Sequence, residues 1–329
     1  MNKGISIRLA FAVLATAVLW PWGHPAAQEW PSAAKAVRIL NPFPPGGASD
    51  IQARAIAARM SQNLGVSFVV ENRPGASTAI AARELIKSPA DGTTVMYTIT
   101  STTSQLPHFF AKPPYDVFRD FTPLGLASYT RTILVAAMSA PYNSVAELIE
   151  YAKANPGKVN YGSFGLGSSA HINGELLKMQ AGVNIVHVPY KGSADAVRDL
   201  FAGQIQLVFD GPTTAVANAR AGKVKILAIA DGQRLPAVPN APTMAEAGVQ
   251  GFDLPGLEQL LGPPGMAPDL VRRINAEFVR AVRSPEVADL LVKGGSTVVG
   301  SSAEEHGRVI KDNHERWGAV IRKLAIRLD

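Results

Sequence analysis

A glycine-rich loop near the start of the chain has the residue types that bind a charged group. Glycine lets the backbone approach a bound group closely, and the free N–H groups at a helix start attract anions. A tight turn without a ligand is an equally good interpretation of this loop taken alone. The candidate binding residues in it are Phe43, Pro45, Gly46, Gly47, Ser49 and Asp50.

A second loop, at residues 163–171, repeats the pattern and favours a binding site shared by both loops. Its hydroxyls and amides also meet at a helix start, as a carboxylate site requires. His171 lies one turn into that helix, where packing is favoured over ligand contact. The candidate binding residues here are Ser163, Gly167, Ser168 and His171.

The second loop also permits a different function. Residues 165–170 match the G-x-G-x-x-A pattern, which would make the protein a nucleotide-dependent, NAD(P)-using oxidoreductase. That pattern needs an acid at the end of the next strand to hold the ribose. The next strand ends near Tyr190, and the first acid after it is Asp195. The anion site is therefore preferred, with the oxidoreductase as the alternative.

Three further polar features lie at or just after the ends of expected strands. Residues 100–104 are five consecutive hydroxyls, typical of a solvated loop, but ligands also bind at such strand ends. Asp210 could accept a hydrogen bond from a ligand or cap the next helix, and both roles stay open. Arg131 could meet a carboxylate, although a solvated surface position is favoured. From the hydroxyl run the candidate binding residues are Thr100, Ser101 and Thr102.

The sequence offers no signal for catalysis or metal binding. It contains no H-E-x-x-H, no G-x-S-x-G and no cluster of metal ligands. We therefore predict that the protein is not an enzyme and has no catalytic residue, no metal and no cofactor. The 32 basic residues exceed the 26 acidic ones only mildly and without a basic run, so nucleic acid is not an expected partner.

Both loops join an expected strand to an expected helix. Residues 37–40 are a short apolar run typical of a strand, and residues 159–163 are predicted to form another short strand. Helices are predicted from Ser49 and from Ala170. Strands alternate with helices on both sides of residue 130. The 329 residues are therefore expected to form two α/β units.

The first 27 residues have the features of a secretory signal peptide. Lys3 and Arg8 give a positive start, residues 9–20 are apolar, and cleavage is expected near Ala27. The chain contains no cysteine, so no lipid-bearing cysteine can anchor it. We expect a periplasmic protein without a lipid anchor.

Short motifs in a consistent order cover almost the whole remaining chain. They lie at residues 38–50, 70–76, 91–93, 114–116, 120–123, 144–147, 154–158, 165–171, 187–192, 209–210 and 242–248. Together they resemble the extracytoplasmic solute receptors of tripartite tricarboxylate transporters, the Bug-type binding proteins.

This resemblance implies a two-lobed, type II periplasmic-binding-protein fold, with two α/β domains joined by a hinge of crossing strands. We place one lobe at 28–126 plus 235–329 and the other at 127–234. A small carboxylate would be bound between the loops at 43–50 and 163–171. Expected partners are cytoplasmic-membrane permease subunits or a sensor kinase, and a monomer is expected.

Three departures from the family pattern leave the identity of the carboxylate open. Residues 101–104 replace a Gly-Thr-His-Ala-like segment, and Leu106 stands where Asn is common. Leu257 replaces a usual Trp, and the turn at 262–266 differs from the family's Ala-Pro-x-Gly-Thr-Pro. Neither glycine loop contains Lys or Arg. We therefore expect backbone amides at two helix starts, with Ser168, to hold the anion.

Overall fold

The computed structural model describes residues 1, 30–31 and 36–327. The expected signal peptide lies almost entirely outside these residues and stays a prediction. Within the described ranges, no helix is long and apolar enough to cross a lipid bilayer.

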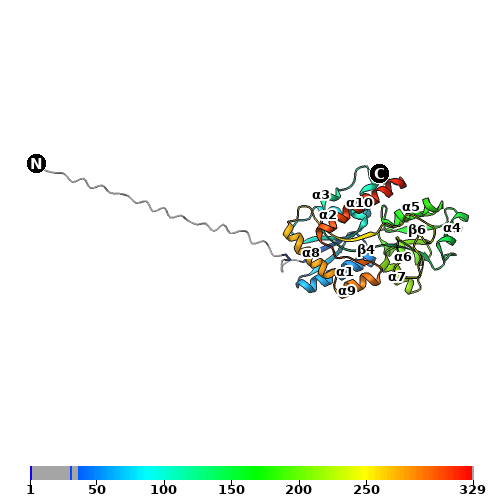
Figure 1. The fold of residues 1–329 in the computed structure, drawn as a ribbon, viewed down its shortest axis with the longest axis horizontal. Helices are drawn as coiled ribbons and strands as arrows, with labels where there is room; N and C mark the ends of the chain where they lie inside the picture. Colours follow the sequence, from blue (N-terminus) through cyan, green and yellow to red (C-terminus); the bar gives the residue numbers. More distant parts are fainter. Residues whose placement is uncertain (2–29, 32–35, 328–329) are drawn as a thin grey trace.

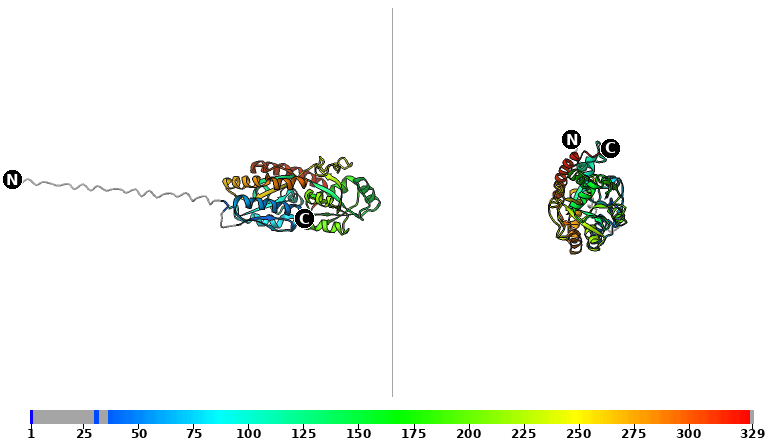
Figure 2. Two further views of the ribbon diagram at one scale, coloured as in Figure 1. Left: turned by 90° about the horizontal axis from the view of Figure 1, so that it is seen from below. Right: turned by 90° about the vertical axis from the view of Figure 1, so that its right-hand side faces the viewer.

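Two separate β-sheets divide the molecule into two lobes, which Figures 1 and 2 show side by side along its long axis. We call the part built on the six-stranded sheet lobe 1 and the part built on the five-stranded sheet lobe 2. Helices cover both sheets. The expectation of two α/β units is confirmed.

The sheet of lobe 1 has the strand order β11-β4-β10-β3-β1-β2. Strand β1 pairs in parallel with β2 and β3, because helices carry the chain back between them. Strand β10 runs antiparallel between β3 and β4, and no strand was predicted there. The strands are β1 (Val37–Asn41), β2 (Phe68–Asn72), β3 (Thr94–Ile99), β4 (Thr122–Thr130), β10 (Gly256–Gly262) and β11 (Thr297–Val298).

The first helix of lobe 1 begins directly at the first glycine loop. Helix α1 starts at Ala48 with Gly47 as N-cap, and no described side chain caps it. The predicted helix start at Ser49 is therefore one residue late, since the glycine takes the extended N-cap backbone. The longer helices of this lobe are α1 (Ala48–Leu64), α2 (Ala79–Ile86), α8 (Pro268–Val282), α9 (Pro285–Lys293) and α10 (Ala303–Leu324), and α3 (Val117–Asp120) is a single turn.

The sheet of lobe 2 has the order β7-β6-β8-β5-β9. Its central strand β8 is fully buried, which fits its apolar sequence before Asp210. The strands are β5 (Thr132–Ala137), β6 (Asn160–Ser163), β7 (Val186–Pro189), β8 (Leu207–Asp210) and β9 (Val224–Ala230). The helices are α4 (Val145–Ala154), α5 (Ser169–Ala181), α6 (Ser193–Phe201) and α7 (Pro212–Arg220).

The chain crosses between the two sheets later than the predicted boundaries at 127 and 235. Strand β4 stays hydrogen-bonded to β10 up to Thr130, so Arg131 marks the first crossing. After β9 the chain remains on lobe 2, where Thr243 bridges Ile229 and Phe252 joins the hydrophobic core. The second crossing therefore precedes β10, near Leu254. The sequence placed both crossings early because it did not reveal the β4–β10 ladder.

Helix α10 of lobe 1 also packs into lobe 2. Trp317 and Ile321, near its C-terminal end, belong to the same hydrophobic cluster as Leu134 and Tyr161 of lobe 2. Both α10 side chains are almost fully buried. The two lobes therefore share apolar contacts along this helix.

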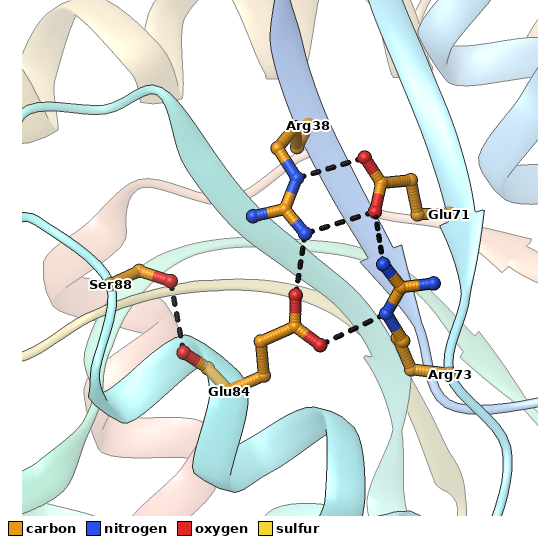
Figure 3. Close-up of polar contacts among 5 residues, drawn as sticks. All are labelled: Arg38, Glu71, Arg73, Glu84 and Ser88. Carbon is orange, nitrogen blue, oxygen red and sulfur yellow. Dashed lines mark hydrogen bonds and ion pairs between the residues drawn. The ribbon is translucent and has the colours of Figure 1, made fainter.

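A network of two arginines and two glutamates joins β1, β2 and α2 behind the first loop (Figure 3). Arg38 contacts both Glu71 and Glu84, and Arg73 contacts the same two carboxylates at 2.7 and 3.0 Å. The hydrogen bonds from Arg38 hold the pKa of Glu71 below its usual value. Because all four side chains are 26–41% exposed, each pair adds only about 0–1 kcal/mol of stability. The network fixes the end of β2, and with it Asn72.

Candidate functional site

A cavity of about 690 Å³, part of it open to solvent, lies between the lobes. Lobe 1 contributes the first glycine loop, the end of β3, the start of β10 and one residue of α10. Lobe 2 contributes the starts of its helices and the strand ends at the two crossings. The lining residues are Phe43, Gly47, Ala48, Ser49, Ile99, Thr100, Thr130, Arg131, Thr132, Phe164, Ser169, Asn173, Ser193, Gly211, Ala230, Leu254, Gly256, Glu258 and Trp317.

Asp50 holds the first glycine loop in shape. Its carboxylate accepts from the Gly46 N–H at 2.9 Å, from Arg54 Nε at 3.0 Å and from Asn72 Nδ2 at 2.8 Å. Burial acts to raise the pKa of Asp50, but the hydrogen bonds from Arg54, Gly46 and Asn72 outweigh it and lower the pKa. Asp50 is thus committed to the loop, while Gly47, Ala48 and Ser49 face the cavity.

Four helices begin at the cavity wall. The N-caps Gly47 of α1 and Gly211 of α7 line the cavity. So do the first residues of α5 and α6, Ser169 and Ser193. No described side chain caps α1, α6 or α7, so their first-turn N–H groups stay available. Partial positive charge at four helix ends makes the cavity favourable for an anion. Two of these ends were expected and two were not.

The second glycine loop uses most of its donors internally. Gly167 N–H donates to His171 Nδ1 at 3.0 Å, and Gly165 N–H donates to Ser163 Oγ at 3.2 Å. Ser168 caps α5 by accepting from the His171 N–H, and its own hydroxyl donates to the Gly165 carbonyl. The groups of this helix start that line the cavity are instead Ser169 and, one turn later, Asn173.

His171 packs behind the loop, as the favoured interpretation expected. Its ring stacks on His187 with centroids 4.1 Å apart, and His187 Nε2 lies 2.7 Å from Ser163 Oγ. Burial lowers the pKa of His171 and brings that of His187 to about 3. Both rings are therefore neutral at physiological pH and support residues 163–168 from behind.

The predicted site residues divide into three groups. Phe43, Gly47, Ser49 and Thr100 line the cavity, although the Thr100 hydroxyl already accepts from the Leu257 N–H. Pro45 and Gly46 are exposed at the loop tip. The remaining residues support the walls without lining them, and these are Asp50, Ser101, Thr102, Ser163, Gly167, Ser168, His171 and Asp210.

The hydroxyl run after β3 is not a solvated loop. Residues Ser101–Gln105 form a helical turn that is completely buried. Thr102 Oγ1 bonds Thr98 at 2.6 Å, and Ser101 donates to Gln105 Oε1 at 3.2 Å. Gln105 in turn reaches across to Ser169 of lobe 2 at 2.9 Å. The run thus satisfies its own hydroxyls inside the protein and positions Gln105.

The structure gives the roles of two charged residues, Asp210, whose role the sequence left open, and Arg131, which was expected at the solvated surface. Asp210 supports the turn into α7 without capping the helix, since its carboxylate accepts from the N–H of the N-cap residue Gly211 at 2.8 Å and from Thr214 Oγ1 at 2.6 Å. Burial raises its pKa to about 7. Arg131 is not a solvated surface residue, because its side chain is only 14% exposed, lines the cavity and pairs with Asp231 at 2.9 Å.

Glu258 is a cavity residue that the sequence analysis missed. It lies in β10, is 3% exposed, and accepts from Gln52 Nε2 at 2.8 Å and from Ser128 Oγ. Burial raises its pKa, against the opposing hydrogen bonds from Ser128 and Gln52. The sequence signal that could have identified Glu258 was an acidic residue inside the largely apolar segment 256–262. Gln52 also donates to Thr213 of lobe 2, so this cluster touches both lobes.

No three acidic or histidine side chains in the described part of the chain lie close enough to hold a metal ion. The polar groups that face the cavity are hydroxyls, helix-end amides, one amide side chain and the charged residues above. This set of groups suits the binding of a small organic anion.

Comparison with known sequences places the chain next to a family of transport receptors. Residues 52–326 match the family described as the tripartite tricarboxylate transporter family receptor. A UPF0065 protein from the tcbD–tcbE intergenic region of Pseudomonas sp. (strain P51) is 37% identical over 282 residues, 85% of this chain and 83% of that protein. Protein BugT of Bordetella pertussis is 31% identical over 300 residues, 90% and 91% of the two chains.

Solved structures superpose on nearly the whole molecule. Rpa4515 of R. palustris, solved with adipate, has a TM-score of 0.86 at 34% identity and covers 91% of this chain and 99% of its own. The periplasmic binding protein BugD has a TM-score of 0.85 at 28% identity, with 89% and 98% covered. MatC from Rhodopseudomonas palustris with bound malate has a TM-score of 0.83 at 30% identity, with 87% of this chain and 99% of that chain covered.

Proposed function

The chain belongs to the tripartite tricarboxylate transporter family of receptors, and from this premise we propose that it binds a small mono-, di- or tricarboxylate between its lobes. Family and fold are those of periplasmic solute-binding receptors, as the resemblance implied, and not of enzymes. The alternative of an NAD(P)-dependent oxidoreductase is therefore wrong. Two amides of the 165–170 loop, those of Gly165 and Gly167, also donate to Ser163 and His171, which leaves fewer donors for a pyrophosphate.

The observation that carries the proposal is the meeting of four helix starts at one cavity. Helix α1 belongs to lobe 1, while α5, α6 and α7 belong to lobe 2, so an anion there contacts both lobes. A ligand that contacts both lobes favours their closed arrangement over an open one. Adipate and malate are the ligands of two similar structures, which supports a carboxylate.

The expected affinity follows from these contacts. A helix start favours an anion by roughly 0.3–2 kcal/mol, and a hydrogen bond to a charged group adds about 1.5–3 kcal/mol. Three or four such contacts, less the cost of immobilising the ligand, are compatible with micromolar binding. Arg131 is occupied by Asp231, so no free arginine holds the anion at this wall. Weak holding of this kind suits a protein that must release its ligand.

The receptor role further implies a location and a partner. We propose that the chain is exported to the periplasm, loses residues 1–27, and delivers its ligand as a monomer to membrane permease subunits or a sensor kinase. Mass spectrometry of periplasmic fractions checks the first part, because the intact N-terminus would be found there if no cleavage occurs.

A thermal-shift screen tests the binding proposal. Small mono-, di- and tricarboxylates are compared with NAD(H) and NADP(H) on the purified protein. A carboxylate at 100 times its Kd stabilises the fold by about 2.7 kcal/mol, which raises the midpoint of a chain of this length by roughly 4 °C. A shift with nicotinamide nucleotides alone, and with none of the carboxylates, would refute the proposed function.

A further inference from the structure

The walls of the cavity are largely apolar and aromatic. Phe43 of lobe 1 and Phe164 of lobe 2 meet edge to face with centroids 6.3 Å apart. Ile99, Leu254 and Trp317 add further apolar surface. Such walls favour a ligand with an apolar body, because burying each methylene against them strengthens binding by about fourfold.

The side-chain groups of Thr132, Ser169 and Asn173 on the lobe 2 wall are occupied by protein partners. Asn173 Nδ2 donates to Thr132 Oγ1 at 2.6 Å. Ser169 Oγ lies within hydrogen-bonding distance of both polar atoms of Gln105. A polyhydroxylated or highly charged ligand would have to break these bonds or leave its own groups unpaired.

The charged side chains of the lining do not favour a second carboxylate. Arg131 is the one cation among the described lining residues, and it pairs with Asp231 at 2.9 Å and donates to Thr297 Oγ1 at 3.1 Å. Glu258 also lines the cavity, and its partners Gln52 and Ser128 are neutral. The side chains around this wall therefore leave one negative charge unbalanced.

These observations point to a ligand class narrower than that of the proposed function, on which this inference rests. We propose that the ligand is a monocarboxylate with an apolar body, and that Glu258 is the specificity residue that rejects a second carboxylate. The single carboxylate binds at the helix starts. The apolar body lies against Phe43, Phe164 and Trp317.

Glu258 acts through the charge of its carboxylate, which the hydrogen bonds from Gln52 and Ser128 favour against the opposing effect of burial, and it needs no contact with the ligand. Both carboxylate oxygens already accept hydrogen bonds, one from Gln52 and one from Ser128. In a cavity with little water, two like charges several ångströms apart repel strongly enough to change affinity at least tenfold. A neutral glutamine of the same shape removes that repulsion.

Isothermal titration with matched six-carbon probes tests the inference on the purified protein. Hexanoate, adipate and 6-aminohexanoate differ only in the group at the far end, and acetate lacks the apolar body. We expect hexanoate to bind at least tenfold tighter than adipate, and far tighter than acetate. Adipate tighter than hexanoate, or acetate equal to hexanoate, would overturn the proposed ligand class.

Two substitutions assign the selectivity to charge. Glu258→Gln should reduce the preference for hexanoate over adipate by about tenfold, whereas the exposed control Glu304→Gln should leave it unchanged. Asp231→Asn frees Arg131 and should also favour adipate, so it provides a second test if Glu258→Gln does not fold. Unchanged selectivity in the folded variants would remove Glu258 from this role.

The remaining outcomes separate this inference from the proposed function. Tightest binding of 6-aminohexanoate would make Glu258 a partner for a ligand ammonium group and overturn the apolar-body proposal. If carboxylates bind but adipate is preferred, the receptor function stands and this inference fails. If no carboxylate of any class binds, the proposed function itself fails.

Discussion

The two glycine loops have the same sequence pattern but present different groups to the cavity. Each follows a strand and precedes a helix. In each, a glycine N–H donates to the side chain four positions later, from Gly46 to Asp50 in one loop and from Gly167 to His171 in the other. They differ at the N-cap. Gly47 leaves the start of α1 uncapped, whereas Ser168 occupies a first-turn donor of α5.

This difference separates a glycine needed for binding from a glycine needed for folding. Gly47 has an ordinary backbone conformation, and its missing side chain leaves room for Ser193 of the opposite lobe. Gly167 has a φ of +73°, and a side chain there would press on Phe109. Of these two glycines, Gly47 borders the ligand cavity and Gly167 does not.

The largest effect is expected for Gly47→Val. A Cβ at this position would lie 3.1 Å from Ser193 Oγ, and valine's further methyl groups would occupy the cavity and hold the lobes apart. We expect Kd for the best carboxylate to rise more than about 100-fold, or ~2.7 kcal/mol, with little change in thermal midpoint. Calorimetric titration beside Gly232→Val is the measurement, since Gly232 has only one atom near its Cβ position, at 3.9 Å. Equal binding by both variants would contradict the role of Gly47.

Gly167→Val should act on stability instead. Valine rarely adopts this backbone conformation, and its Cβ would lie 3.0 Å from the Phe109 ring. We expect a loss of about 2 kcal/mol in the free energy of unfolding, measured by urea denaturation. A variant of normal stability that no longer binds ligand would show that this glycine, too, serves the ligand directly.

Ser168→Ala should have a smaller effect of the same kind. It removes the N-cap of α5 and should cost about 1 kcal/mol of stability. Ser302→Ala removes the corresponding cap of α10 and is the matched control. Affinity should change less than about threefold in both variants. A tenfold loss of affinity in Ser168→Ala alone would place its hydroxyl on the ligand.

The smallest effect is expected for the pH dependence of stability, through the buried ring of His187 behind the second loop. Burial brings the pKa of His187 to about 3, below the value of about 6.5 in an unfolded chain. Between these values the unfolded chain binds a proton that the folded chain does not, so stability falls as the pH falls below 6.5. We expect His187→Gln to reduce the loss of stability between pH 6.5 and 5 by the order of 1 kcal/mol. Parallel pH curves for wild type and variant would refute this.

The sequence predicted the parts of the site that depend on local order. The short strands predicted before the glycine loops became β1 and β6, and the helices after them begin within one or two residues of the predicted starts. Family motifs added the two-lobed fold. These features follow from propensity, glycine and capping, which neighbouring residues reveal.

The parts that were missed depend on contacts between distant residues. Arg131 was expected at the surface because its partner Asp231 lies 100 positions away at the other crossing. Glu258 was missed because its strand has no alternating pattern and is buried along its whole length. The starts of α6 and α7 face the cavity only because the lobes bring them to α1, which no local pattern encodes.

The packing of α10 into lobe 2 also has a consequence for the direction of opening. In Figure 1 this helix runs along the upper edge of the molecule, and α1 and α7 lie along the lower one. Helix α10 holds Trp317 and Ile321 in an apolar cluster shared with lobe 2, whereas the loops before α1 and α6 meet in a close contact of Pro44 with Gly192. Exposing the apolar side to water costs about 25 cal/mol per Å², so we expect the lobes to swing apart at the lower edge with α10 as the pivot.

The absence of native cysteine makes this one-sided swing measurable with paired spin labels. Pro45 and Lys191, next to the contact of Pro44 with Gly192, are exposed on the two lobes, and Ala319 of α10 and Gln180 of α5 are exposed as well. Removing the ligand should lengthen the first distance and leave the second nearly constant. Equal lengthening of both distances would mean that the lobes move apart by translation and do not rotate about α10.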